Sequence, residues 1–212
     1  MLPRGEESAL NEEEKNALID ECISTKDAEE LMLLLDEIGD NDRTLAAFDR
    51  CFSEDHELYA ELCEKGVEIN NPVAHHMHAV SLIKKAKEDE DDASKLAKLK
   101  EARLHLRKSI SKGFAPSYFS LALLCHEYFN DDNSAYELAR RGTSLNEKYC
   151  KCLLGYFIAH GIGTRKDFKR GVSMMLESDV GDYLDNFATD IGIYYSFAYI
   201  NKPFESDQDN ES

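Results

Sequence analysis

Three histidines lie within one short segment of this 212-residue chain, Ala74-His75-His76-Met77-His78. If the segment is helical, His75 and His78 lie three positions apart on one face, close enough to ligate a single metal ion. The chain has no HExxH motif, however, and no cysteine pair near these histidines. The sequence therefore favours packing over ligation for this segment, and we predict no metal site.

The remaining residues that could do chemistry form no recognisable catalytic motif. Gly161-Ile162-Gly163 lacks the preceding strand and the third glycine of a nucleotide-binding loop. There is no GxSxG motif and no P-loop, and the carboxylates crowded into residues 1–70 mark no pair for acid–base work. We therefore predict a protein that is not an enzyme and needs no cofactor. A metal-dependent enzyme is the weakest alternative.

Acidic side chains are concentrated near the N-terminus. Residues 1–70 carry 21 acidic and 6 basic side chains, and the whole chain has a formal net charge of −17. Such a surface repels a phosphate backbone and attracts a basic protein, although acidity can also serve solubility alone. The sequence has no run of about 20 apolar residues and no secretory signal pattern. We expect a cytoplasmic protein with a protein or peptide partner, for which a basic one suits this charge best, and with neither nucleic acid nor membrane as a partner.

The six cysteines show no framework spacing. They are Cys22, Cys51, Cys63, Cys125, Cys150 and Cys152. Because there is no CxxC pair, we interpret them as reduced core residues. Disulfides that join paired helices are the alternative.

The elements that must position these residues are helices. Leu31, Leu34, Leu35 and Ile38 form one apolar stripe at helical spacing, and prolines and glycines are few. Within residues 1–70 the pattern predicts helices near 11–24, 27–38, 43–52 and 55–65, with Gly66 as the residue that ends the last one. Residues 183–202, rich in aromatic side chains, are expected to form a closing helix, and residues 203–212 a disordered acidic tail.

Residues 150–182 carry the clearest copy of an internal repeat, and two earlier copies precede it in phase, the first beginning near Pro72. The pattern resembles the Sel-one-like repeat, a form of the tetratricopeptide architecture, over residues 72–182. The positions that carry the resemblance through small size, helix ends or packing are Ala79, Gly113, Ala122, Ala135, Asn146, Leu154, Gly155, Gly161, Gly163, Asp167 and Gly171. His78 takes a position that is leucine in this repeat, which implies packing between helices.

The resemblance implies an all-α fold, a right-handed α-α superhelix (solenoid) built from antiparallel helix pairs. It divides the chain into an acidic helical region (1–70) continuous with the array, three helix-pair repeats (71–182), a capping helix (183–202) and a tail (203–212). It further implies an adaptor or scaffold that binds a partner protein or peptide on its concave face. The residues expected on that face, as first-helix side chains off the packing stripe, are His75, His76, Tyr118, Glu127, Tyr149 and Lys151.

A second function suits the acidic N-terminal third of the chain. A dedicated inhibitor, such as a bacterial immunity protein that neutralises a basic toxin, would use the same surface chemistry against one partner. The sequence leaves the oligomeric state open.

Overall fold

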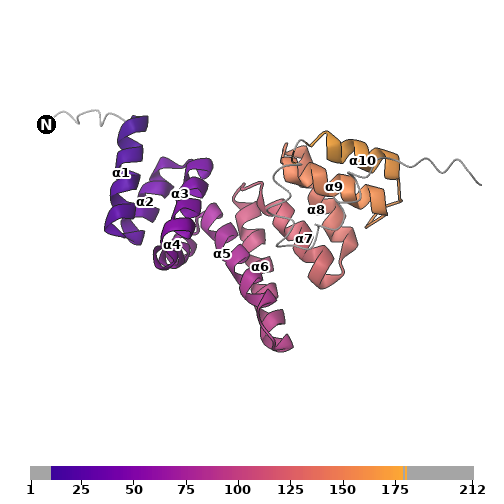
Figure 1. The fold of residues 1–212 in the computed structure, drawn as a ribbon, viewed down its shortest axis with the longest axis horizontal. Coiled ribbons are helices and arrows are strands. Elements are labelled where there is room, and N and C mark those ends of the chain that lie inside the picture. Colours follow the sequence, from indigo (N-terminus) through magenta and orange to yellow (C-terminus); the bar gives the residue numbers. More distant parts are fainter. Residues whose placement is uncertain (1–10, 179, 181–212) are drawn as a thin grey trace, which may run out of the picture. The chain divides into compact units, whose positions relative to one another are not determined.

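The computed structural model describes residues 11–178 and 180, and within them the chain is helical without a strand (Figure 1). The helices are α1 (Glu12–Thr25), α2 (Ala28–Ile38), α3 (Asn41–Glu54), α4 (His56–Glu68), α5 (Pro72–Lys87), α6 (Asp92–Ser111), α7 (Ser117–Phe129), α8 (Asp132–Ser144), α9 (Lys148–His160) and α10 (Phe168–Leu176). The expected all-α architecture is confirmed for this part of the chain. None of these helices is long and apolar enough to cross a membrane.

Short polar side chains fix where the helices begin. Asn11 forms a capping box with Glu14 at the start of α1. At the start of six other helices an aspartate carboxylate accepts hydrogen bonds from backbone N–H groups. These aspartates are Asp27, Asp40, Asp55, Asp91, Asp131 and Asp167. Each cap of this kind stabilises a helix by about 1 kcal/mol, so the many acidic residues of this chain also define its helix boundaries.

The end of α4 corrects the sequence-based prediction. Gly66 does not end the helix, which continues to Glu68. Gly66 is instead buried where α4 meets α5, and a Cβ at this position would overlap the Cβ of Ala74 and lie 2.9 Å from the Met32 sulfur. The chain reverses four residues later at Asn70, whose φ of 64° is left-handed. The glycine is required by close helix packing and not by a turn.

The chain divides into two compact units, the first ending at Ser117 and the second beginning at Tyr118. In the first unit α2, α3 and α4 pack on one another, α4 packs on α5, and α5 pairs with α6. Its core contains fully buried side chains such as Leu31, Phe48, Leu62 and Val73. The domain boundaries expected from the repeat remain a prediction, and residues 183–202 and 203–212 lie outside the described residues.

Small residues bring helices together in the second unit as well. A Cβ on Gly155 would lie 2.7 Å from the carbonyl oxygen of Gly171, and one on Gly171 would lie 2.6 Å from the Cβ of Ala159. The backbones of α9 and α10 therefore touch at this point. Gly161 ends α9 with a φ of 78°, in the left-handed region. These close contacts give each helix pair a fixed geometry.

All six cysteines are free and buried. Burial raises the pKa of the Cys63 thiol to about 12 and that of Cys152 to about 11. These two thiols are therefore protonated at neutral pH and are poor nucleophiles, as expected for core residues.

Candidate functional site

One face of α2 carries more apolar surface than the core can bury. Residues 31–35 read Leu-Met-Leu-Leu-Leu, and five apolar residues in a row extend beyond one face of a helix. Leu31, Met32 and Leu35 are buried, whereas Leu33 is 54% exposed. The third position of the run thus faces outward, as the helical period requires.

Around Leu33 lies a shallow depression of about 410 Å³. Its lining consists of two leucines and four acidic residues, namely Asp27, Glu29, Glu30, Leu33, Leu34 and Glu37. Lys65 forms an ion pair with this lining, and its Nζ lies 3.5 Å from a Glu29 carboxylate oxygen at the exposed surface. An exposed pair of this kind contributes little, so the four carboxylates keep the potential of the depression negative beside its two leucines.

The sequence-based site residues lie elsewhere. His75 is 1% exposed and His76 is 8% exposed, so the expectation that these two side chains stand off the packing stripe is wrong. Both face neighbouring helices because α5 is covered on more than one side, by α4 and by α6. The repeat pattern treats α5 as a first helix with one free face, and it therefore misassigned them.

The other four predicted residues belong to the second unit, and all are half-buried: Tyr118, Glu127, Tyr149 and Lys151. The Tyr149 ring contacts the Phe119 ring at a centroid distance of 5.7 Å. Lys151 Nζ lies 3.2 Å from a carboxylate oxygen of Glu177. Their part in binding a partner remains a prediction.

His76 belongs to a buried polar chain inside the first unit. Ser109 Oγ donates to the Pro72 carbonyl at 2.6 Å, and Ser117 Oγ donates to Ser109 Oγ at 2.7 Å. His76 Nδ1 lies 2.9 Å from Ser117 Oγ. Because the serine proton is already used, the histidine must be the donor at Nδ1. These hydrogen bonds link α5, α6 and the first residue of α7, so the role of His76 is structural.

This burial predicts an acid-sensitive contribution to stability. Desolvation lowers the pKa of His76 from 6.5 to about 4. Between about pH 6.5 and pH 4, His76 is therefore protonated in the unfolded chain but neutral in the folded protein. Stability is lost as the pH falls through this range. At 1.36 kcal/mol per pKa unit, the loss between pH 7 and pH 5 is about 2 kcal/mol.

The variant His76→Asn keeps a donor towards Ser117 but does not titrate. Urea unfolding of both proteins at pH 7 and pH 5 checks the point. We expect the stability difference between them to shrink at pH 5, because only the wild type loses the His76 contribution. A difference that stays constant would contradict the assignment of a neutral buried histidine.

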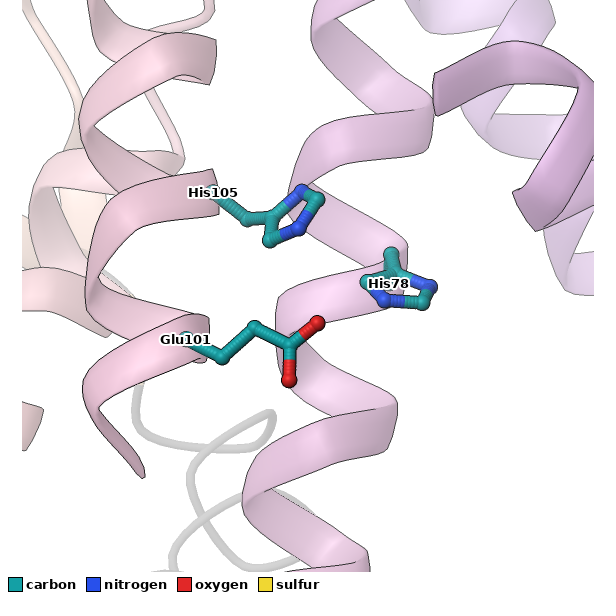
Figure 2. Close-up of side chains that lie close together, drawn as sticks. All are labelled: His78, Glu101 and His105. Carbon is teal, nitrogen blue, oxygen red and sulfur yellow. The ribbon is translucent and has the colours of Figure 1, made fainter. Parts of the chain in front are cut away.

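A second group of polar side chains lies between α5 and α6 (Figure 2). Glu101 and His105 are one turn apart on α6 and reach towards α5, which carries His78. One ligand atom from each of the three residues lies within 4.8 Å of the others. Among the described residues this is the group with the composition and geometry to hold a metal ion. Sequence reasoning paired His78 with His75 and missed it, since Glu101 and His105 lie more than 20 residues away along the chain.

The similarity of this chain to known proteins is distant. No protein-family profile matches the chain, and no curated protein does. Among solved structures, the chain is similar to a Sel1 repeat protein from Oxalobacter formigenes, with 14% sequence identity and a TM-score of 0.37. The similarity covers 91% of this chain and 98% of that one.

Proposed function

We propose that this protein is a non-enzymatic scaffold that binds a partner protein, and that the acidic depression on α2 is a docking surface for it. The observation that carries the proposal is Leu33, a large apolar side chain that is 54% exposed and lines the same depression as four carboxylates. An isolated exposed leucine needs no explanation, but one framed by four acidic side chains offers both an anchor and a charge pattern.

The partner that fits this surface is a basic segment with an apolar side chain. Burial of Leu33 against an apolar anchor contributes about 25 cal/mol per Å² of surface removed from water. Asp27, Glu29, Glu30 and Glu37 line the same depression, and lysine or arginine side chains on the partner would pair with them. Carboxylates at the rim mainly accelerate association and select the partner, while the apolar centre supplies affinity.

The absence of assembled catalytic groups at this surface supports a binding role over a catalytic one. Among the described residues, the lining of the depression holds carboxylates and leucines and no serine, cysteine or histidine. The buried thiols of Cys63 and Cys152 are kept protonated by desolvation, and the buried His76 is committed to a structural hydrogen bond. If Tyr118, Glu127, Tyr149 and Lys151 lie on a concave face, as the repeat resemblance implies, they would supply further contacts in a scaffold that binds an extended partner.

Leu33→Glu is the sharpest test of this surface. It removes the anchor and adds a fifth negative charge where the partner docks, so we expect capture of the partner to fall at least tenfold, about 1.4 kcal/mol in binding free energy. Leu104→Glu is the matched control, because Leu104 is a leucine of similar exposure (58%) on α6. The measurement is a quantitative pull-down from native lysate with mass spectrometry, followed by the affinity of the purified pair and the melting temperature of each variant.

The outcomes separate clearly. A basic protein retained by the wild type and by Leu104→Glu, but lost with Leu33→Glu at an unchanged melting temperature, supports the proposal. If all three proteins retain the same set equally, α2 is not the docking surface. A single basic partner bound at nanomolar affinity, with association slowed strongly by salt, identifies the dedicated inhibitor instead of the adaptor.

A further inference from the structure

We infer that His78, Glu101 and His105 form a binding site for one divalent transition-metal ion, with zinc the best match. The inference is independent of the α2 docking surface. It rests on three side chains from two paired helices whose ligand atoms already lie within 4.8 Å of one another (Figure 2).

A hydrogen-bonded relay orients the His105 ring. His75 Nε2 lies 2.8 Å from the side-chain oxygen of Asn70, which accepts, so His75 carries its proton on Nε2. His75 Nδ1 is then an acceptor, and it lies 2.9 Å from His105 Nδ1. His105 must therefore donate from Nδ1 and keep the lone pair on Nε2. A metal-ligating histidine is typically held in this way, with one nitrogen donating to a partner and the other free for the ion.

Ring contacts hold the middle of the relay. His75 is 1% exposed, and its ring contacts that of His105 at a centroid distance of 5.0 Å, with the ring planes tilted by 53°. The His78 ring also contacts the His105 ring, at a centroid distance of 4.7 Å. The two ligating rings are thus positioned by packing as well as by hydrogen bonds, which reduces the entropy that metal binding would cost.

The geometry needs one modest adjustment. Zinc bonds to nitrogen and oxygen are about 2.0–2.2 Å long, so tetrahedral ligand atoms stand about 3.3 Å apart. Ligand atoms spread over as much as 4.8 Å must therefore close by roughly 1.5 Å at the widest pair. Glu101 is exposed, so its side chain can rotate towards the ion without disturbing the helices. The two imidazoles and one carboxylate then leave a coordination position for water or for a ligand atom of a partner.

The donor set decides the class of ion. Two nitrogens and one carboxylate oxygen suit zinc, cobalt, nickel or ferrous iron better than magnesium or calcium, which prefer oxygen alone. The six cysteines are buried elsewhere in the core, so a thiolate site is not the competing explanation in the folded protein.

The test is a titration of chelator-treated, full-length protein with zinc chloride by calorimetry, with cobalt chloride as a spectroscopic probe. We expect one zinc per chain, bound in the micromolar range or tighter, and a cobalt spectrum without thiolate-to-metal charge transfer. Glu101→Gln and His105→Gln should each weaken zinc binding at least tenfold. Because Glu101 is exposed, its variant will fold even if His105→Gln does not.

His160→Gln is the matched control, because His160 is an exposed histidine in the second unit. Asn70→Ala tests the relay, since loss of an outer-shell partner typically costs 10–100-fold in metal affinity. The inference is overturned if zinc shows no saturable binding, if Glu101→Gln binds zinc as the wild type does, or if His160→Gln weakens binding equally. A cobalt–thiolate band would likewise overturn it. None of these outcomes bears on capture of a partner at Leu33.

Discussion

Replacing Phe48 by alanine should lower the free energy of unfolding of the first unit by about 3–5 kcal/mol. Phe48 lies on α3 with an exposed fraction of 0%, and its ring meets the Tyr59 ring of α4 edge-on at 6.1 Å. Its removal leaves a cavity among Leu31, Leu62 and the other buried side chains of the same core. The surrounding helices are fixed by their own contacts and collapse into the void only in part.

Phe52→Ala provides the comparison on the same helix. Phe52 lies one turn further along α3, is 43% exposed and also contacts Tyr59, at 5.2 Å. Its loss should cost only about 1 kcal/mol, the value of an exposed aromatic pair. Hydrogen exchange of α3 and α4 amides reports the stability of this unit separately from the second. If both substitutions lowered the free energy of unfolding equally, Phe48 would not be a central residue of this core.

Gly171→Ala should destabilise the second unit by about 1–3 kcal/mol. The substitution normally favours a helix by about 1 kcal/mol, so the direction of the result is informative. On α10 the added methyl group would meet the Gly155 carbonyl oxygen and lie 2.6 Å from the Cβ of Ala159. These are atoms of the α9 backbone and of a Cβ, which cannot rotate away, and the two helices must separate.

Ser173→Ala is the control for this effect. Ser173 is exposed on the same helix and its hydroxyl bonds only to the side chain of Glu177, at 2.9 Å. Its substitution should be neutral within about 0.5 kcal/mol. Both variants are compared by thermal unfolding and by hydrogen exchange of residues 168–176. Stabilisation by Gly171→Ala would show that α9 and α10 do not touch at this glycine.

Two surfaces of the first unit thus carry separate proposals. The α2 depression presents an apolar centre within carboxylates, and the α5–α6 pair presents two imidazoles and a carboxylate. The core that includes Phe48 and the close contact of Gly66 with Ala74 hold these helices in place. A destabilising core substitution should therefore weaken both activities, whereas Leu33→Glu and Glu101→Gln should each weaken one.

The positions of several helices could be predicted from the sequence because they depend on local residue patterns. The stripe of Leu31, Leu34, Leu35 and Ile38 predicts α2, and aspartates ahead of apolar runs predict helix starts such as Asp131 and Asp167. Helix periodicity and capping depend on residues within about four positions of one another. Single-sequence reasoning can reach such distances.

Burial on a second side of a helix could not be predicted in the same way. His75 and His76 were expected off the packing stripe and are buried, because α4 and α6 both cover α5. Gly66 was expected to end a helix, and instead its lack of a side chain lets Ala74 of α5 pack closely against α4. In each case the deciding neighbour belongs to another helix, and one periodic stripe cannot show how many helices will pack around it.

The sequence by itself determined that this chain is helical, where its helices begin, and that its N-terminal third is acidic. Tertiary structure alone decided which side chains meet. It left Leu33 exposed among carboxylates on α2, and it brought Glu101 and His105 of α6 to His78 of α5. The physical reason is range: a hydrogen bond or cap within a helix is set by neighbours in the chain, whereas a binding surface is set by the packing of helices whose contacts join distant residues.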